Sequence, residues 1–274
     1  MIHSRLGCST ISFRHLPLDR ALRWIGSLGF AEVDLGALPG VCDHVPYVLD
    51  HDAVAAVTDT VRASGIRVRS INGDIGDLNR PLDTDGRAAR DTHLAMLLEL
   101  TAATGAQALV LPCGAIDHQP LQSLDDDLDL VARELTRAAE RAARYGVEIW
   151  TESLHFYRLC WNLERAQQLT DRLAGTPLRL VMDFSHIVAS GGDPEEFVDR
   201  FGDRIAHVHI RDAVPGNINL SVGRGVVDFA RGVKALADKA YAGHFALELE
   251  TRDVTNDQRP AATAAAAQLI SDLI

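Results

Sequence analysis

Four polar residues stand at the carboxyl ends of four apolar segments, and their types suit the binding of a metal ion. They are Glu152 in VEIWTES, Asp183 in LRLVMDFSH, His209 in IAHVHIRD and Glu248 in HFALELE. An apolar run that ends in an acid or a histidine is typical of a buried strand that carries a polar group to a site. Three carboxylates and one imidazole, without a thiolate, favour a divalent cation such as Mn²⁺, Mg²⁺, Co²⁺ or Zn²⁺ over a structural zinc site. The four residues therefore predict a divalent-metal site.

Two of these positions have a rival two residues away along the same strand. Side chains two apart point the same way from a strand, so His207 competes with His209, and Glu250 competes with Glu248. His209 lies nearer the carboxyl end of its strand and is the predicted ligand, with His207 as an interior neighbour. Position alone leaves the choice between Glu248 and Glu250 open.

The elements that must position these residues alternate between strand and helix along the whole chain. The expected strands are Arg5–Ser12, Ala31–Leu35, Ile66–Ile71, Ala108–Leu111, Val147–Glu152, Leu178–Asp183, Ile205–Ile210 and Phe245–Glu250. The expected helices, several of which end at a glycine, are Leu18–Leu28, Ala53–Ser64, Asp91–Thr104, Asp126–Tyr145, Asn162–Leu173, Pro194–Phe201, Phe229–Ala240 and Pro260–Leu273. This alternation predicts a single (β/α)8 TIM barrel, an α/β fold, over residues 1–274. A doubly wound sheet is disfavoured because the first strand runs into CSTISFRHLP, without a GxGxxG fingerprint.

A barrel of this kind would bring the four predicted ligands together. The active sites of (β/α)8 barrels form at the carboxyl ends of the strands. The four residues belong to the fifth, sixth, seventh and eighth expected strands, which are neighbours in such a barrel. We therefore expect them to meet in one half of the barrel mouth.

The composition argues against several classes of partner. The net charge is −11 and no basic run occurs, whereas proteins that bind nucleic acid carry basic stripes that neutralise phosphates. The apolar runs are too short to span a membrane, and the first residues lack the pattern of a signal peptide. The four cysteines are far apart and form no CxxC pair. We expect a cytoplasmic protein with reduced thiols that binds neither nucleic acid nor membrane.

Several motifs resemble those of the xylose isomerase-like TIM-barrel superfamily, and the sugar phosphate isomerase/epimerase group within it is the nearest likeness. The motifs are TES, MDFSH, HVHIRD, GRGVVDF and YAGHFALELE, and the likeness extends over nearly the whole chain. The resemblance implies metal ligands at the same four positions. The last ligand of the family stands five residues after the glycine that precedes the eighth strand, and a count from Gly243 gives Glu248 rather than Glu250.

The resemblance also implies residues that bind substrate. His186, three residues after Asp183, matches a family histidine that touches substrate or metal. Epimerases of free ketoses place an arginine where this chain has Val214 and Pro215, so Arg211 or Arg224 would have to take that part. Further candidates to contact substrate are His155 and Arg158 in SLHFYR, Asn72 and Asp74 after the third strand, and Glu32, which resembles a position near the mouth of related barrels.

The likeness predicts an isomerase or epimerase of a sugar or related hydroxy-ketone, acting by proton transfer through a metal-stabilised enediolate. Glu152 and Glu248 are the expected acid and base. The main alternative is a metal-dependent dehydratase, a lyase, of an inosose- or dehydroshikimate-like substrate. An AP-endonuclease-like enzyme fits the charge of −11 poorly, and a non-catalytic binding protein fits the intact ligand set poorly. Either of the two main hypotheses implies a small carbohydrate-like substrate and a part in carbohydrate metabolism. Manganese is among the candidate ions. A homo-oligomer is compatible with the resemblance, because dimers and tetramers are common in the family.

Overall fold

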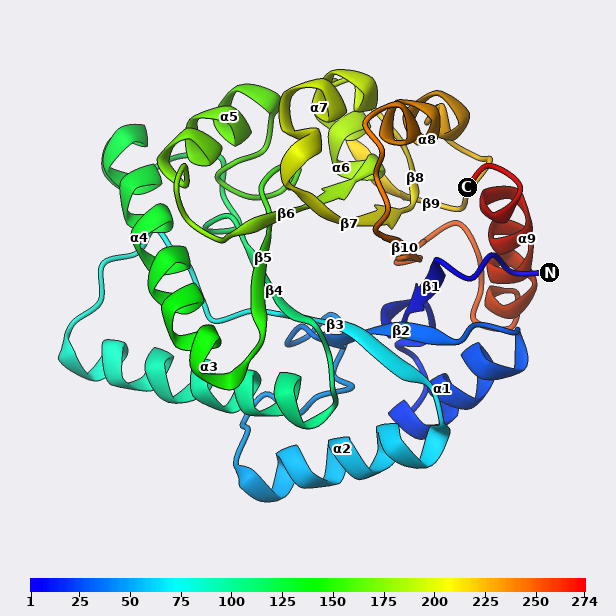
Figure 1. Cartoon of the computed structure of the whole chain (residues 1–274), viewed down its shortest axis with the longest axis horizontal. Helices are drawn as coiled ribbons and strands as arrows, with labels where there is room; N and C mark the ends of the chain where they lie inside the picture. Colours follow the sequence, from blue (N-terminus) through cyan, green and yellow to red (C-terminus); the bar gives the residue numbers. More distant parts are fainter.

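Eight parallel strands form a closed barrel in the computed structural model of the chain, which describes residues 1–274 (Figure 1). Around the barrel the strands follow the order β1, β10, β7, β6, β5, β4, β3, β2. β1 pairs with both β2 and β10, and this closes the ring. The strands are β1 (Leu6–Ser9), β2 (Glu32–Ala37), β3 (Arg67–Gly73), β4 (Ala108–Pro112), β5 (Glu148–Glu152), β6 (Arg179–Asp183), β7 (Ile205–Ile210) and β10 (His244–Leu247). The predicted fold class is confirmed.

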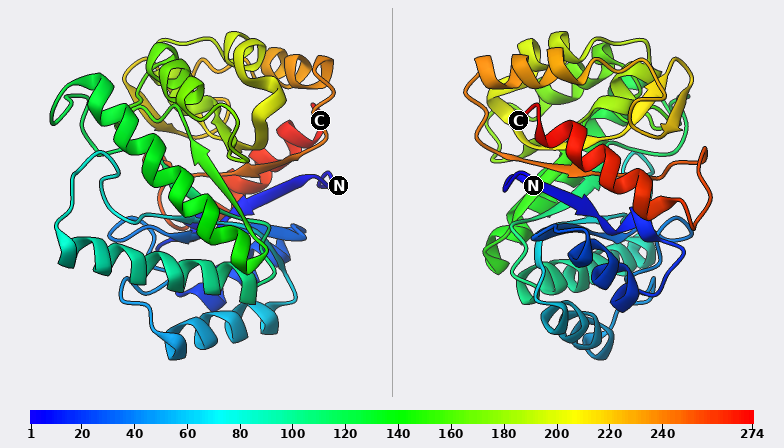
Figure 2. Two further views of the ribbon diagram at one scale, coloured as in Figure 1. Left: turned by 60° about the vertical axis from the view of Figure 1, so that its left-hand side comes forward. Right: turned by 90° about the vertical axis from the view of Figure 1, so that its right-hand side faces the viewer.

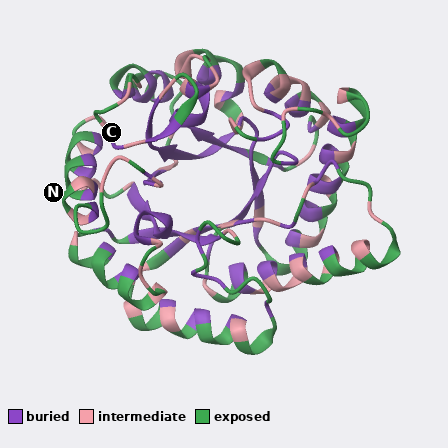
Figure 3. Cartoon of the chain, turned by 180° about the vertical axis from the view of Figure 1, so that it is seen from behind, coloured by how far each residue is buried: buried purple, intermediate pink, exposed green.

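The helices lie outside the barrel and bury one face each against it (Figures 1 and 2). They are α1 (Leu18–Ser27), α2 (His51–Ser64), α3 (Thr84–Ala103), α4 (Leu124–Ala142), α5 (Leu163–Arg172), α6 (Phe184–Ala189), α7 (Pro194–Phe201), α8 (Phe229–Asp238) and α9 (Arg259–Ser271). Buried side chains concentrate on the strands and on the inward faces of these helices (Figure 3). None of the helices is both long and apolar enough to cross a membrane.

The strands are apolar on both faces because both faces are buried. On β4, all five residues of ALVLP are buried. Alternate residues of β4 to β7 form a small cluster inside the barrel around Trp150, whereas the residues between them join the large cluster under the helices. A strand buried on both sides reads as a continuous apolar run, which is why most strands were visible in the sequence.

Helix boundaries differ from the sequence expectation where a side chain caps the first turn. α3 begins at Thr84 rather than Asp91, because the Asp83 carboxylate accepts a hydrogen bond of 2.8 Å from Gly86 N. α2 and the turn after α4 end at Gly65 and Gly146, both in the left-handed conformation with φ of 70°. Those glycine stops were predicted correctly.

Several short elements were not predicted. The first strand ends at Ser9, and the next residues form a short 3-10 helix, Thr10–Phe13. α6 follows β6 directly, and the chain after β7 forms a hairpin of β8 (Asp212–Val214) and β9 (Asn217–Leu220). Two further short 3-10 helices, Ala143–Tyr145 and Gly202–Arg204, precede β5 and β7. The extra elements after β6 and β7 lie next to the predicted metal ligands.

The two ends of the chain lie side by side, next to α9 and β1 (Figure 2). A hydrogen bond of 3.0 Å from His3 N to Ser271 Oγ ties them together. The carboxyl end of the chain therefore packs across the same seam at which β1 and β10 close the barrel.

Candidate active site

The four predicted ligands meet at the carboxyl ends of neighbouring strands. Glu152 and Asp183 are the last residues of β5 and β6, and His209 lies near the end of β7, paired in register with Asp183. Glu248 directly follows β10, where its N–H donates to Ile210 O at 3.0 Å, so it does not lie on the strand as expected. One potential ligand atom from each of the four lies within 4.8 Å of the other three. The structure thus brings the predicted set together.

The two carboxylate oxygens of Asp183 have different environments. Asp183 Oδ1 caps α6, accepting hydrogen bonds from Ser185 N at 2.6 Å, Ser185 Oγ at 2.7 Å and His186 N at 3.3 Å. Asp183 Oδ2 turns the other way, where Arg211 NH2 donates to it at 3.3 Å and His186 Nε2 lies 3.8 Å away. The MDFSH segment therefore fixes the carboxylate and starts the helix that carries His186.

The four side chains fit a divalent cation. They are buried, with exposures of 7% for Glu152, 1% for Asp183, 0% for His209 and 5% for Glu248. Glu152 Oε1 and His209 Nδ1 lie 3.8 Å apart, and neither has a hydrogen-bond partner. Buried polar atoms without partners cost free energy, and a cation between them would satisfy both. Oxygen-rich sites with one imidazole suit the divalent ions named above.

The electrostatics of the cluster agree with this interpretation. Burial raises the pKa of Glu152 to about 7; the contact with His209 opposes the shift, and the carboxylates of Asp183 and Glu248 add to it. Burial lowers the pKa of His209, but the carboxylates of Glu248, Asp34 and Glu152 together move it well above its ordinary value. Without a cation the cluster therefore retains protons that metal binding would release.

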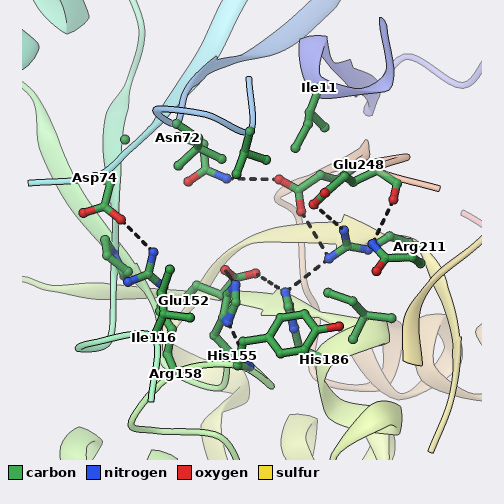
Figure 4. A pocket seen from close by; sticks show the side chains of 18 of the residues that line it. Ile11, Asn72, Asp74, Ile116, Glu152, His155, Arg158, His186, Arg211 and Glu248 are labelled. Atoms are coloured by element: carbon green, nitrogen blue, oxygen red, sulfur yellow. Dashed lines mark hydrogen bonds and ion pairs between the residues drawn. The ribbon is translucent and has the colours of Figure 1, made fainter. Parts of the chain in front are cut away.

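Arg211 lies among the acidic residues of the site (Figure 4). Its side chain is 2% exposed, with NH2 3.3 Å from Asp183 Oδ2 and 3.9 Å from Glu248 Oε2. Its NH1 lies 3.6 Å from Glu250 Oε2, and its Nε donates to Ser185 Oγ. The predicted substrate-binding arginine thus lines the pocket, where it also holds three carboxylates in place.

Two stacked imidazoles form another wall of the site. The rings of His155 and His186 have centroids 3.9 Å apart. Burial lowers the pKa of each well below 6.5. The charges of His186, Arg158 and Arg211 add to the effect on His155, and those of Arg211, His209 and Arg158 add to the effect on His186. Phe156 N donates to His186 Nδ1 at 3.1 Å. A neutral imidazole has one acceptor nitrogen, so His186 Nε2 carries the hydrogen, and the 3.2 Å approach of Arg211 NH2 to it is a contact and not a hydrogen bond. That N–H faces Glu152 Oε1, 3.9 Å away.

A pocket of about 240 Å³ opens over the cluster (Figure 4). On one wall Asn72 Nδ2 donates to Glu248 Oε1 at 3.0 Å, and Arg158 NH2 pairs with Asp74 Oδ2 at 2.7 Å. The apolar part of the lining consists of Ile11, Leu38, Pro39, Val41, Pro112, Ile116 and Ile218, and Tyr157 also lines the pocket. The pocket thus combines polar walls with apolar side chains around them.

The predicted site residues are placed as follows. The pocket is lined by Glu152, Glu248, His186, Arg211, His155 and Arg158, together with Asn72 and Asp74. Asp183 and His209 complete the ligand set without lining the pocket. Arg224 is 62% exposed beside Asp253, outside the lining.

The expectation for Glu32 is wrong. Glu32 is the first residue of β2, so it lies at the opposite end of the barrel from the ligands. There it pairs with Arg69 at 3.0 Å and with His244, the first residue of β10, at 2.5 Å. The four cysteines are all free and buried.

Sequence reasoning missed the carboxylate of Asp34. It lies inside the barrel on β2, 1% exposed, and accepts a hydrogen bond of 2.7 Å from His207 Nε2. His207 is an interior residue, as expected. The only sequence signal for Asp34 was an acid in the middle of the apolar segment AEVDLG, which does not say on which face of the strand it stands.

Comparison with known proteins finds one matching family and several relatives that are similar to this chain. A sequence model of the family described as xylose isomerase-like TIM barrel matches residues 22–273. The rhizopine catabolism protein MocC of Rhizobium meliloti is 26% identical over 85% of this chain and 75% of its own length. An inosose dehydratase of Lacticaseibacillus casei is 24% identical over 46% of this chain and 48% of its own length. A 3-dehydroshikimate dehydratase of Pseudomonas aeruginosa is 30% identical over 52% of this chain, but only 23% of that protein is covered.

Solved structures share the fold at low sequence identity. The IOLI protein, crystallised with a bound zinc atom, has a TM-score of 0.79 at 17% identity, covering 98% of this chain and 99% of its own. The 3-keto-D-glucoside 4-epimerase YcjR of E. coli has a TM-score of 0.77 at 20% identity, covering 97% of this chain and 100% of its own. At these identities the likeness concerns the fold alone.

Proposed function

Because the chain belongs to the xylose isomerase-like TIM-barrel family, we propose that it is a divalent-metal-dependent isomerase or epimerase of a sugar or related hydroxy-ketone. The observation that carries the proposal is the buried cluster of three carboxylates and one imidazole at the floor of a pocket. The zinc atom in the IOLI structure supports a divalent ion. We further propose that residues 1–274 act as one domain on a small carbohydrate-like substrate.

Two carboxylates on different strands are placed to move a proton. A divalent cation bound here would withdraw electrons from a substrate carbonyl and so acidify the neighbouring C–H bond. Glu152 and Glu248 come from β5 and from the end of β10, with two strands between them in the barrel, so one could remove the proton and the other return it on the opposite face. Asn72 fixes the Glu248 carboxylate. The His186 Nε2–H and Arg211 would hold substrate oxygens.

A dehydratase is the second candidate, and two of the relatives named above, the inosose dehydratase and the 3-dehydroshikimate dehydratase, support it. In that reaction a glutamate removes the same proton, and a hydroxyl on the next carbon leaves as water after accepting a proton. The neutral His186 imidazole, with its hydrogen on Nε2, would donate a hydrogen bond to that hydroxyl, and the glutamate that took the proton would return it to the leaving oxygen. The two reactions would therefore use the same residues to remove the proton, and they differ only in whether the neighbouring hydroxyl then leaves.

Proton exchange in D₂O tests the proposal directly. The metal-loaded protein is incubated with a panel of ketoses and inososes, and NMR follows the loss of the C–H signal beside the carbonyl. We expect exchange with the wild type and none with Glu152→Gln of unchanged circular dichroism. Full exchange by that variant would contradict the assignment of Glu152. An ultraviolet band from an unsaturated ketone, with irreversible loss of substrate, identifies the dehydratase.

A further inference from the structure

The arginine on one wall of the pocket is already committed to a partner. Arg158 is 7% exposed; its NH2 lies 2.7 Å from Asp74 Oδ2 and its NH1 donates to Gly114 O at 2.8 Å. An anionic substituent of a substrate would have to break this pair before it could bind the guanidinium. Breaking a buried pair leaves a buried carboxylate without its counter-charge, which is costly.

Neither of the other two arginines of the pocket has a buried guanidinium group that is free to bind an anion. Arg211 is held by the three carboxylates described above. Arg252 stands at the rim, where it is 69% exposed and 3.9 Å from Glu250, so water screens its charge. No lysine lines the pocket. The pocket and cluster together contain five carboxylates and three arginines, an excess of two negative charges that a divalent cation would balance.

In the glycine-rich turn after β9, backbone N–H groups that could bind an anion already donate hydrogen bonds to carboxylates of the chain. Loops after the seventh and eighth strands of such barrels frequently bind phosphate through backbone N–H groups. Here Asp212 Oδ2 accepts from Gly223 N at 2.8 Å, and Asp212 Oδ1 accepts from Val227 N at 3.2 Å. A Cβ at Gly225 would lie 2.2 Å from Asp212 Oδ1, so the glycine makes room for this carboxylate. Asp253 accepts from Ser221 N in the same way.

We propose that the substrate is an uncharged polyhydroxy ketone, without a phosphate or carboxylate group. The inference rests on the proposed function and narrows its substrate class. The two buried arginines of the pocket pair with carboxylates of the chain. In the turn, Asp212 accepts from Gly223 N and Val227 N, and Asp253 accepts from Ser221 N. The net charge of −11 acts in the same direction, since it disfavours the approach of anions. Among dehydratase substrates, the site therefore favours an inosose over the acid 3-dehydroshikimate.

Binding of matched ligand pairs tests this inference without depending on turnover. Calorimetry on the manganese-loaded protein compares D-tagatose with D-tagatose 6-phosphate, and scyllo-inosose with 3-dehydroshikimate. We expect the neutral member of each pair to bind at least about tenfold more tightly. Equal or tighter binding of an anionic member overturns the inference, even if proton exchange upholds the proposed function. If the protein catalyses no proton exchange but still binds the neutral ligand of each pair more tightly, the proposed reaction is refuted and the proposed substrate class is upheld.

A charge variant sharpens the test. Asp74→Asn frees Arg158, so the preference for D-tagatose over its 6-phosphate should fall severalfold. Asp77→Asn removes one charge from the same loop outside the pocket, where Asp77 pairs with Arg80, and should leave the preference unchanged. An unchanged preference in Asp74→Asn, or an equal fall in both variants, contradicts the part assigned to the Arg158 pair.

A separate observation concerns the buried chain of polar groups beneath the metal ligands. Ser70 Oγ donates to Asp34 Oδ1 at 2.8 Å, and His207 Nε2 donates to Asp34 Oδ2 at 2.7 Å. His209 Nε2 lies 3.4 Å from the same Oδ2, and its Nδ1 lies 3.3 Å from Glu248 Oε2. Asp34 and the three side chains that surround it are at most 1% exposed. One ring nitrogen of His209 thus faces a fixed anion, and the other faces the carboxylates of the cluster.

We infer that Asp34 is a positioning residue for the metal. His209 Nε2 makes no hydrogen bond but lies 3.4 Å from Asp34 Oδ2, so a cation at Nδ1 would leave the ring hydrogen on Nε2, facing this carboxylate. Partners of this kind orient a ligating imidazole and typically contribute 10- to 100-fold to metal affinity. His207 and Ser70 hold Asp34 itself in place.

Metal affinity, measured apart from activity, tests this role. We expect Mn²⁺ to bind Asp34→Asn about 10- to 100-fold more weakly than wild type in a chelator competition. Asp127→Asn is the matched control, because Asp127 is equally buried and hydrogen-bonded but lies on α4, bonded to Asn79. That control should lose stability and keep its affinity. Wild-type affinity in Asp34→Asn, or an equal loss in both variants, overturns the inference. If Asp34→Asn does not fold, Ser70→Ala should show a severalfold loss, and wild-type affinity there has the same meaning.

Discussion

At the two ends of the barrel, the pKa values of two buried glutamates are shifted in opposite directions. At the bottom, Glu32 is surrounded by partners; burial raises its pKa, but hydrogen bonds from His244 and Arg69 outweigh this and lower the pKa overall. At the mouth, Glu152 is buried beside two further carboxylates, and its pKa rises to about 7. Residues at the bottom of such barrels serve stability, and those at the mouth serve function. In this barrel, the buried glutamate with positively charged partners stabilises the fold, whereas the buried glutamate beside other carboxylates belongs to the candidate active site.

Removing the charge at the mouth should have the largest effect on activity and little effect on stability. We expect Glu152→Gln to lose about 1000-fold or more in proton exchange, since a general base typically contributes 10²- to 10⁴-fold. The metal-free variant should be at least as stable as wild type in a urea titration, because like charges no longer repel. A large loss of stability with activity retained would erase the contrast between the two ends.

The corresponding change at the bottom should do the reverse. Glu32→Gln leaves Arg69 and His244 without their buried counter-ion, and breaking such a pair costs about 3–5 kcal/mol. Urea unfolding should show this loss, while Mn²⁺ affinity at the mouth stays at the wild-type value. A drop in metal affinity would mean that the two ends are coupled.

The pH dependence of the metal-free protein should separate the two glutamates. The folded pKa of Glu152 lies above that of the unfolded chain, so its charge costs stability as the pH rises from about 4.5 to about 7. The folded pKa of Glu32 is lowered, so its contribution is present above about 4.5 and is lost as the pH falls through the folded value. Relative to wild type, Glu152→Gln should gain stability as the pH rises, and Glu32→Gln should gain it as the pH falls. Parallel profiles would refute the assignment.

The smallest effect is expected outside both regions. Arg224 is 62% exposed and 3.7 Å from Asp253, so Arg224→Ala should change the free energy of unfolding by less than about 1 kcal/mol. Ligand binding should not change. A loss of ligand binding in this variant would show that the turn contacts substrate after all.

The sequence predicted the barrel because nearly every strand is an apolar run and several helices stop at glycine. It predicted the four clustered residues because they end four neighbouring strands. The short helix that carries His186 was not foreseen, because its start depends on which oxygen of Asp183 turns toward the backbone. Asp34 was missed because its role depends on His207, far away in the chain. Glu32 was misplaced because the likeness to related barrels was followed, although a residue at the start of a strand lies at the end opposite the mouth.

The most direct test of the account is the metal content of the protein. Purified chain is stripped with a chelator, dialysed against a trace mixture of Mn²⁺, Co²⁺, Mg²⁺ and Zn²⁺, and analysed by mass spectrometry of the elements. The account predicts one divalent ion per wild-type chain and a near-complete loss in His209→Gln of unchanged circular dichroism. A wild type without bound metal, or a variant that still binds one ion per chain, would contradict it.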